Sequence, residues 1–303
     1  MTPLILRAAL ACGLMVSAEA QALESSVSSS VSIQRPERVV LLALDGLSSR
    51  GLKLAASPRL DELAEQGLFI ERSQGVMPSK SAPNWTSILT GVWPDDHGIQ
   101  SNQWWWFRWN RRLTHPTLFT VLKKQKPNAF TSAVYEWKHF GRLWAEEDVD
   151  RALWSPNPSK TVRRVKEILE NEAPRLLVVH LLQADLAGHK YGWGSAPYLR
   201  AISRVDAQVG EVLDKLKKLG LEKNTLVVVA SDHGGVGKRH GGDSESELFT
   251  PVILRGPGIN ARQHRTQEIR NVDLTATIMR ALNLQTPAGL RGKALEVPWP
   301  KSQ

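Results

Sequence analysis

Cysteine is nearly absent from this sequence of 303 residues, in which Cys12 is the only thiol. Cys12 lies in an N-terminal stretch with the pattern of a secretory signal: an early cation at Arg7, an apolar run over residues 8–16, and small residues at Ala18 and Ala20. We therefore expect residues 1–20 to be a signal peptide and the chain to be exported, periplasmic or secreted. Cleavage after Ala20 removes the thiol, which excludes disulfides and a cysteine nucleophile in the exported chain.

Long apolar runs and an excess of acid are also lacking. The run over residues 8–16 is well short of the roughly 20 residues that a membrane-spanning helix needs, so no stable membrane span is expected. Asp and Glu number 30 against 39 Lys and Arg, which gives a formal net charge of +9. A positive field favours anionic ligands, and a small phosphate ester, nucleic acid or an anionic membrane face would each satisfy it. Charge alone leaves the partner open.

No internal repeat or long linker interrupts the rest of the chain. Residues 21–37, rich in Ser and without an apolar pattern, are predicted to form a flexible lead-in, and residues 38–303 a single catalytic α/β domain. Short β-branched or Leu-rich runs alternate there with longer stretches of helical period, which is typical of a mostly parallel central sheet with helices on both faces. Strands are predicted over residues 39–44, 129–135, 175–182, 226–230 and 251–254. Helices are predicted over residues 58–66, 83–90, 117–124, 160–170, 198–219 and 272–282.

Acidic and histidine residues follow three of the predicted strands. The set consists of Asp45, Asp185, His189, Asp232, His233 and His240. In such sheets the loops at the carboxyl ends of the strands form the ligand crevice. Three converging carboxylates need a counter-charge, and mixed carboxylate and imidazole ligands suit zinc-like ions. We therefore predict two Zn²⁺ sites, with manganese or iron as alternative metals. Taken singly, each motif has an ordinary alternative, such as a helix cap for Asp45.

A possible nucleophile lies between these segments. Pro83 suits the first turn of a helix, where its missing N–H is not needed, so Ser81 is predicted at the helix N-terminus. Peptide N–H groups and the helix dipole favour an anion there, whether an ionised serine oxygen or a bound phosphate. Without the metal ligands, an ordinary capping role for Ser81 would explain the same pattern.

Several strings together resemble the type I phosphodiesterase/nucleotide pyrophosphatase branch of the alkaline phosphatase superfamily. They are Lys80-Ser81-Ala82-Pro83-Asn84, Thr90-Gly91, Pro94-Asp95-Asp96-His97-Gly98-Ile99, Asp185-x-x-Gly188-His189 and Asp232-His233-Gly234. The resemblance extends from Val39 to about Ile259 and implies an alkaline-phosphatase-like fold. It implies that one zinc meets Asp45, Ser81, Asp232 and His233, that the other meets Asp185, His189 and His240, and that the amide of Asn102 contacts the phosphate.

The resemblance also implies a reaction. It is hydrolysis of a small anionic phosphate ester, preferably a phosphodiester or pyrophosphate, through a phosphoseryl intermediate on Ser81; nucleic acid is not expected as a partner. Phosphomonoesterase, phosphotransferase and sulfatase activities, and a binding protein without turnover, remain alternatives, and the oligomeric state is open. The sulfatase string would have Arg where this chain has Trp85.

The sequence departs from the branch at two points. Serine stands where the branch usually has threonine, and His240 follows Asp232 closely, so the chain resembles a shortened member. His97 is predicted to be structural. The run from Trp104 to Trp109 is predicted to pack in the core or in a loop, with lining of the crevice as the alternative.

Overall fold

The computed structural model describes residues 34–103 and 113–300, which belong to one compact unit. The predicted signal peptide with Cys12, most of the lead-in and the run from Trp104 to Trp109 lie outside the described residues. Among the described residues, nine strands form one sheet in the order β4-β3-β5-β1-β6-β7-β2-β8, with β9 also paired to β2. The strands are β1 (Arg38–Leu44), β2 (Leu68–Gln74), β3 (Thr131–Tyr135), β4 (Arg151–Trp154), β5 (Leu176–Leu181), β6 (Thr225–Ala230), β7 (Phe249–Arg255), β8 (Gln263–Arg265) and β9 (Ile269–Arg270).

The middle of the sheet is parallel and buried. β1 lies between β5 and β6, so that Val39 pairs with Leu176 on one side and Leu226 on the other. β5 and β6 are buried along their whole length, as expected for strands covered on both faces. β7 runs antiparallel to both of its neighbours, β6 and β2. The three adjacent parallel strands β5, β1 and β6 thus have their carboxyl ends at the same edge of the sheet.

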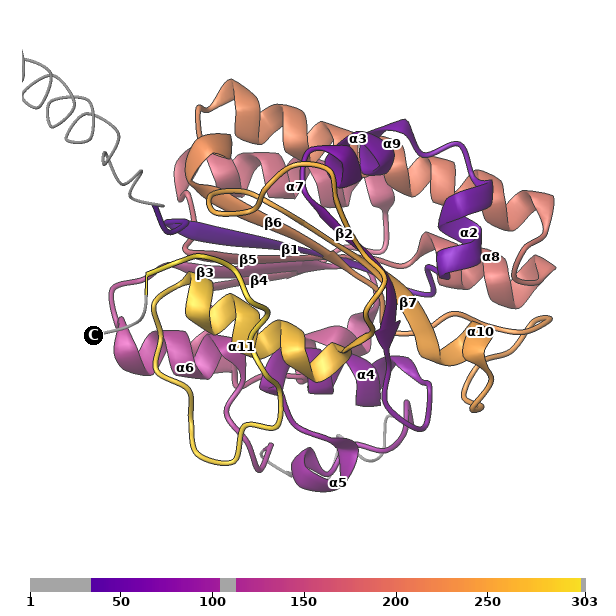
Figure 1. Cartoon of the computed structure of the whole chain (residues 1–303), viewed down its shortest axis with the longest axis horizontal. Coiled ribbons are helices and arrows are strands. Elements are labelled where there is room, and N and C mark those ends of the chain that lie inside the picture. Colours follow the sequence, from indigo (N-terminus) through magenta and orange to yellow (C-terminus); the bar gives the residue numbers. More distant parts are fainter. Residues whose placement is uncertain (1–33, 104–112, 301–303) are drawn as a thin grey trace, which may run out of the picture. The chain divides into compact units, whose positions relative to one another are not determined.

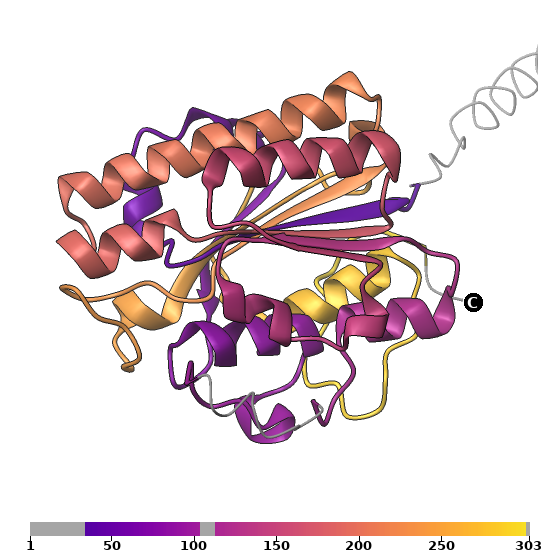
Figure 2. The same cartoon turned by 180° about the vertical axis from the view of Figure 1, so that it is seen from behind.

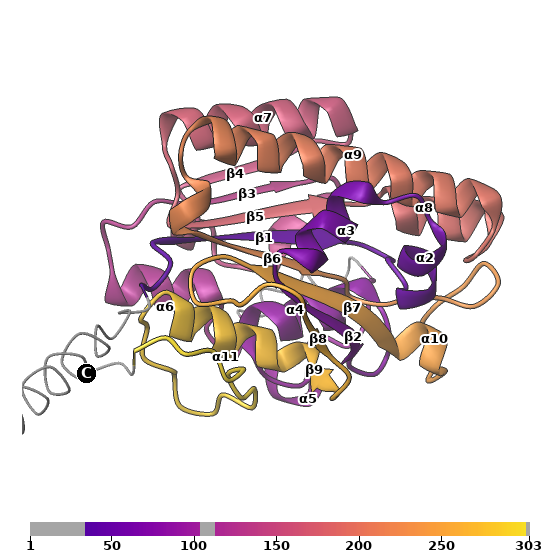
Figure 3. The same cartoon turned by 45° about the horizontal axis from the view of Figure 1, so that its top comes forward.

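Helices cover both faces of this sheet. They are α2 (Ser49–Leu54), α3 (Pro58–Glu65), α4 (Ser81–Thr90), α5 (Pro94–His97), α6 (Leu118–Gln125), α7 (Pro158–Asn171), α8 (Gln183–Tyr191), α9 (Ala196–Lys218), α10 (Glu245–Leu248) and α11 (Asn271–Ala281). Figures 1 and 2 show α3, α7 and α9 on one face and α4, α6 and α11 on the other. Figure 3 shows β4, β3, β5, β1 and β6 side by side beneath α7 and α9.

Alternation along β1 explains why both faces are apolar. Val40, Leu42 and Leu44 pack in the core beneath α3, α7 and α9. Because successive side chains of a strand point to opposite faces, Val39 and Leu41 face the other helix layer, and both are fully buried. At about 25 cal/mol per Å² of apolar surface removed from water, this two-sided burial is the main stabilising contribution to the fold. Among residues 34–103 and 113–300, no helix combines the length and apolarity that crossing a membrane would require.

The predicted fold class is confirmed: the sheet is mostly parallel and has helices on both faces. Each of the five predicted strands and six predicted helices corresponds to an observed element, with bounds shifted by a few residues. The sequence did not predict β2, β4, β8 and β9, or the short helices α2, α5 and α10. Helix α8 was not predicted either, although a helical turn was expected to place Asp185 and His189 on one face. β4 is an edge strand of only four residues, RALW, which is too short to show the alternation of a strand.

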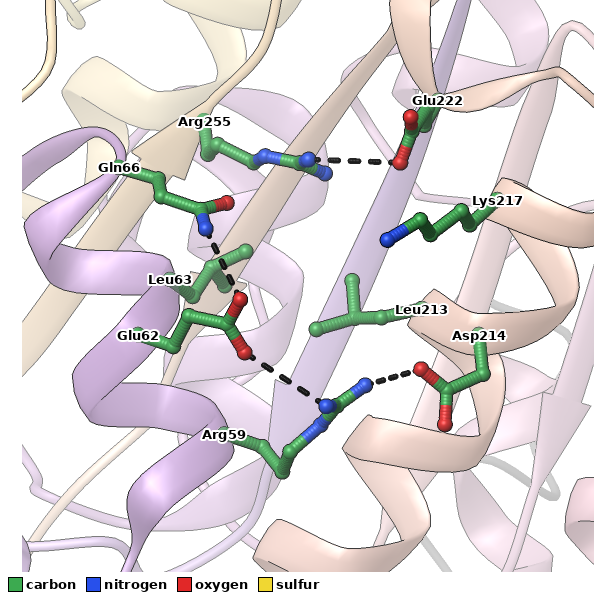
Figure 4. A pocket seen from close by; sticks show the side chains of 9 residues that line it. All are labelled: Arg59, Glu62, Leu63, Gln66, Leu213, Asp214, Lys217, Glu222 and Arg255. Atoms are coloured by element: carbon green, nitrogen blue, oxygen red, sulfur yellow. Dashed lines mark hydrogen bonds and ion pairs between the residues drawn. The ribbon is translucent and has the colours of Figure 1, made fainter.

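A mixed-charge pocket of about 180 Å³ lies between α3 and α9, at the amino ends of the parallel strands (Figure 4). Its cations are paired: Arg59 contacts Glu62 and Asp214, and Arg255 contacts Glu222. Lys217 also lines this pocket. Because three carboxylates balance the three cations, the pocket has no net charge with which to select an anionic ligand.

Candidate active site

The first group of candidate ligands consists of Asp45, Asp232 and His233, which follow β1 and β6. All three are fully buried. Nε2 of His233 lies 3.2 Å from Oδ2 of Asp232 and 3.8 Å from Oδ1 of Asp45. One potential ligand atom from each residue lies within 4.8 Å of the others, a spacing that could surround one cation. Adjacent parallel strands thus bring together residues that are 187 positions apart.

The second group consists of Asp185, His189 and His240. Asp185 lies in the first turn of α8 and His189 one turn later, so both side chains share a helix face. Oδ1 of Asp185 lies 3.5 Å from Nε2 of His189 and 3.7 Å from Nε2 of His240, and the two Nε2 atoms are 3.1 Å apart. The rings of His233 and His240 stack with centroids 3.6 Å apart, which makes the two groups neighbours.

One oxygen of each carboxylate has no partner. Oδ1 of Asp45, Oδ1 of Asp185 and Oδ2 of Asp232 are buried and accept no hydrogen bond within the described chain. Such an atom costs about 1–3 kcal/mol or more when it is left unsatisfied. These are also the oxygens that face the histidine Nε2 atoms. A divalent cation in each group would satisfy them, and the mixed donor set fits zinc.

Backbone carbonyls orient all three histidines. Nδ1 of His233 lies 2.8 Å from the carbonyl oxygen of Gly234, and Nδ1 of His240 lies 2.8 Å from that of Ser79. Nδ1 of His189 is 3.1 Å from the carbonyl oxygen of Lys238. A carbonyl only accepts, so each of these contacts puts the proton on Nδ1 and leaves the Nε2 lone pair free. Ligating histidines are held in the same manner in metal sites.

Burial and mutual repulsion shift the pKa values of these groups. Burial, and then the nearby charge of Asp45, raise the pKa of Asp185 and of Asp232 well above the usual value. Burial also acts to raise the pKa of Asp45, but hydrogen bonding and charge from His180 outweigh it and lower that pKa. Burial, followed by the charge of His233, lowers the pKa of His240 to about 4, so its imidazole is neutral near pH 7.

These shifts predict how metal-dependent stability varies with pH. The pKa values of Asp185 and Asp232 are higher in the folded protein than in the unfolded chain. These two carboxyl groups therefore stabilise the metal-free fold fully below about pH 3.8, and this stabilisation is lost as the pH rises through their pKa values in the folded protein. His240 has the opposite sign, and its contribution is complete above its ordinary pKa of 6.5. As the pH rises further the metal-free protein loses the contribution of the two carboxyl groups, so the gain in melting temperature on adding zinc is expected to increase with pH.

Melting curves with chelator and with zinc, measured at several pH values from 6.5 upwards, test this expectation. A zinc-induced increase that stays constant across this range would contradict the assignment of protons to Asp185 and Asp232 in the metal-free protein.

Ser81 begins α4 and lies beside the first group. Its Oγ is 3.2 Å from Nε2 of His233, and the residue is 5% exposed, so only a small opening reaches it. Asn102 is held over this hydroxyl: its Oδ1 accepts the N–H of Ala82 at 2.8 Å, and its Nδ2 lies 3.5 Å from Oγ of Ser81. Since Oδ1 is used by the backbone, the amide N–H groups face the nucleophile. All predicted site residues are thus gathered at one edge of the sheet.

A sequence model of the family described as "Type I phosphodiesterase / nucleotide pyrophosphatase" matches residues 39–242. The chain belongs to this family. The match covers both candidate ligand groups, Ser81 and Asn102.

Known members of the type I phosphodiesterase family are similar to this chain over about two thirds of its length. Human ectonucleotide pyrophosphatase/phosphodiesterase family member 1 is 28% identical over 219 residues, which cover 64% of this chain and 23% of that protein. An uncharacterized pyrophosphatase/phosphodiesterase of Schizosaccharomyces pombe is 28% identical over 217 residues, covering 65% of this chain and 44% of that protein. The chain thus spans between about a quarter and a half of the length of these relatives.

Solved structures of the family have the same fold. The structure of human ectonucleotide pyrophosphatase/phosphodiesterase 5 matches with a TM-score of 0.72 and 14% identity, over 85% of this chain and 97% of that chain. The murine protein matches with a TM-score of 0.68 and 15% identity, over 82% and 96%. At this identity the likeness establishes the alkaline-phosphatase-like arrangement of sheet and helices.

Sequence reasoning missed two groups that hold Asp45. Nε2–H of His180 donates to Oδ2 of Asp45 at 2.9 Å, and Nε1–H of Trp85 donates to the same oxygen at 3.1 Å. His180 is fully buried in β5, where its ring packs 4.3 Å from that of Phe140. A histidine inside an otherwise apolar strand was the available signal. With Oδ2 occupied, Oδ1 is the oxygen left to bind a cation.

Replacing His180 by phenylalanine is expected to weaken zinc binding by about 10–100-fold, because Asp45 loses a donor that orients it. The phenyl ring fits the aromatic surroundings, so the fold should persist. Zinc affinity measured by competition with a chromophoric chelator checks this. His180→Gln retains an N–H donor and should lose less affinity than His180→Phe; equal zinc affinity in wild type and His180→Phe would contradict the role.

Ser79 ties the loop that carries His240 to the loop that carries the nucleophile. Besides its carbonyl contact with His240, its Oγ accepts the N–H of Gly241 at 3.0 Å and donates to the carbonyl of Gly242 at 2.6 Å. Glu247 accepts the N–H of Gly242 at 2.8 Å. Neither residue was singled out from the sequence; the contacts of Ser79 join segments more than 160 positions apart and have no local pattern.

His97 has the structural surroundings that its sequence context indicated. Its Nδ1 accepts the N–H of Ile99 at 3.1 Å, which leaves Nε2–H to donate to Oγ of Ser87 at 3.0 Å. Burial lowers the pKa of His97 to about 4, so the ring is neutral near pH 7. With both nitrogens occupied, His97 has no lone pair for either ligand group.

Proposed function

We propose that this chain is an exported, two-zinc phosphodiesterase that cleaves phosphodiester or pyrophosphate bonds through a phosphoseryl intermediate. One observation carries the proposal: Ser81 lies at the N-terminus of α4, with its Oγ 3.2 Å from His233, beside two groups of buried carboxylate oxygens that lack partners. Membership of the type I phosphodiesterase family supports the reaction class. The signal-like residues 1–20 support export to the periplasm or beyond.

The proposed zinc ligands are the residues of the two groups. One ion would be held by Asp45, Asp232, His233 and Oγ of Ser81, and the other by Asp185, His189 and His240. When bound, such ions supply Lewis-acid stabilisation of phosphate oxygens and favour the ionised form of an attached hydroxyl. Among the described residues, no further group of this kind is found. A phosphate monoester carries more negative charge than a diester and would need additional positive charge in the site. Two metal sites, without a third in the described part of the chain, therefore favour diester or pyrophosphate substrates.

Ser81 and Asn102 perform the proposed chemistry. Oγ of Ser81 forms a bond to phosphorus while the bond from phosphorus to the leaving oxygen breaks. Nδ2 of Asn102 donates to a phosphate oxygen, where negative charge develops, and the positive end of the α4 dipole favours that charge. Water then cleaves the Ser81–phosphate bond and restores the hydroxyl. Oδ1 of Asn102 stays bonded to Ala82, which holds the amide in place for both steps.

The proposal is tested by assaying the zinc-loaded protein on aryl phosphate diesters, aryl phosphate monoesters, aryl sulfates and a dinucleoside polyphosphate under the same conditions. Turnover of the diester or the polyphosphate should exceed that of the monoester and the sulfate by about tenfold or more, a difference of roughly 1.4 kcal/mol in transition-state stabilisation. A preference for the monoester or the sulfate would reject the proposed substrate class. Transfer of the phosphoryl group to an added alcohol, detected by product analysis, would identify a phosphotransferase instead.

A further inference from the structure

Two exposed segments form a cationic and apolar ledge beside the second ligand group. The ledge consists of the exposed residues Leu186, Lys190, Tyr191, Val236, Lys238 and Arg239. They come from α8, which carries Asp185 and His189, and from the turn between His233 and His240. No acidic residue occurs in residues 186–191 or 234–241, and the next exposed acid along the chain is Asp243.

Backbone contacts hold the two segments of the ledge together. The N–H of Trp193 donates to the carbonyl of Gly237 at 2.8 Å, and His189 contacts the carbonyl of Lys238. Val236 and Arg239 exchange backbone hydrogen bonds of 2.9 and 3.0 Å, which closes a tight turn at whose centre Gly237 has φ +55°. Glycine adopts this left-handed conformation without steric cost. The two segments of the ledge are therefore held in a fixed arrangement by backbone hydrogen bonds.

Large apolar side chains project from the ledge among the cations. Leu186 is 56% exposed, Tyr191 47% and Val236 53%. Lys190 lies over the ring of Tyr191, with its Nζ 5.1 Å from the ring centroid. Lys and Arg beside an exposed Tyr and aliphatic residues are the combination found where proteins meet a lipid interface: the cations attract anionic headgroups and the apolar side chains enter the acyl boundary.

We propose that this ledge docks the protein onto an anionic lipid bilayer surface, with the second ligand group facing the headgroups. Charge complementarity favours an anionic partner, and the exposed Leu186, Tyr191 and Val236 favour a lipid surface over an acidic polymer, which offers no apolar layer to enter. His189, whose side chain is 46% exposed, belongs to the same helix as the ledge, so docking would bring the membrane surface to the mouth of the site. The surface is independent of the reaction proposed for Ser81.

The expected affinity for membranes is modest and depends on salt. Each basic residue close to an anionic bilayer increases partitioning about fivefold, so three of them contribute about 100-fold if their effects add. This contribution is screened at high ionic strength, since the Debye length is about 8 Å at 0.15 M salt and about 3 Å at 1 M.

The test is cosedimentation of the zinc-loaded exported chain, without residues 1–20, with vesicles of phosphatidylcholine alone or mixed with phosphatidylglycerol. One variant combines Lys190→Gln, Lys238→Gln and Arg239→Gln. Its matched control combines Lys217→Gln, Lys218→Gln and Lys223→Gln, which removes the same charge from exposed lysines near the start of β6, at the other end of the parallel strands. A third variant, Tyr191→Ser with Val236→Ser, removes apolar surface and keeps the charge. Zinc content and melting temperature verify that each variant is folded.

Wild type should prefer the anionic vesicles, and the ledge charge variant should lose about 100-fold in partitioning while the control loses about twofold at most. The apolar variant should lose about tenfold. Equal binding of wild type to both vesicle types would overturn the proposal. Equal losses in the ledge and control charge variants would show that net charge alone drives binding. Unchanged binding of the apolar variant would show that the ledge recognises only negative charge, as it would on an acidic polymer. Either result would also overturn the proposal.

Discussion

Replacing Ser81 by alanine is expected to lower phosphodiester turnover by roughly 10⁴-fold, because the proposed covalent mechanism loses its acceptor for the phosphoryl group. The loss should appear in kcat. Zinc binding should largely persist, since the three carboxylates and three histidines remain, and substrate should still bind. Steady-state kinetics with the zinc-loaded variant measure the effect, and acid quenching of wild type during turnover, followed by mass spectrometry of the peptide that contains Ser81, detects the phosphoseryl intermediate.

Two further variants make the Ser81 result specific. Ser87→Ala removes a buried hydroxyl from the same helix, at a residue whose Oγ bonds His97 and not the ligand groups. It should cost about 1–3 kcal/mol of stability through the unsatisfied His97 but leave kcat within about twofold. Ser81→Thr keeps the hydroxyl and should retain most of the turnover. If Ser81→Ala kept wild-type kcat, the covalent mechanism would be wrong.

The position of the candidate site could be predicted from the sequence because its ligands follow strongly apolar strands. β1, β5 and β6 consist almost entirely of Val, Leu and Ala, and a residue directly after such a strand lies at the edge of the sheet. Asp45 follows β1 directly, and Asp232 comes two residues after the end of β6. The pairing of β1 with both β5 and β6 then brings their ends together, which local sequence alone does not determine.

The elements that were missed lack a local pattern of this kind. β2 has the sequence LFIERSQ, in which the second half is polar, and its position depends on pairing with β7 some 180 residues later. His180 and Trp85 were missed as partners of Asp45 for a related reason. They come from two different elements, β5 and α4, and only the folded chain shows that both donate to one oxygen. Long-range hydrogen bonds to a buried carboxylate have no signature in sequence spacing.

Removing the metal is expected to abolish turnover and to destabilise the protein. Three buried carboxylates share this edge of the sheet, and one oxygen of each has no partner. Without a cation, their repulsion is relieved by proton uptake on Asp185 and Asp232, whose pKa values are raised by burial and by the charge of Asp45. A ligand at about 1,000 times its Kd stabilises a folded protein by about 4 kcal/mol. For a chain of this size, we therefore expect the melting temperature to fall by about 10 °C on chelation.

Dialysis against a chelator, followed by addition of zinc, tests this expectation with three readouts. Turnover should fall by about 10³-fold or more and return with zinc, the melting temperature should follow it, and an indicator dye in weak buffer should record proton uptake as the metal leaves. Ser81→Ala is the matched control, because it should show the changes in melting temperature and protons without any turnover to lose. A chelated wild type with unchanged melting temperature and full activity would mean that protons and hydrogen bonds alone balance Asp45, Asp185 and Asp232, and the two-zinc proposal would then be wrong.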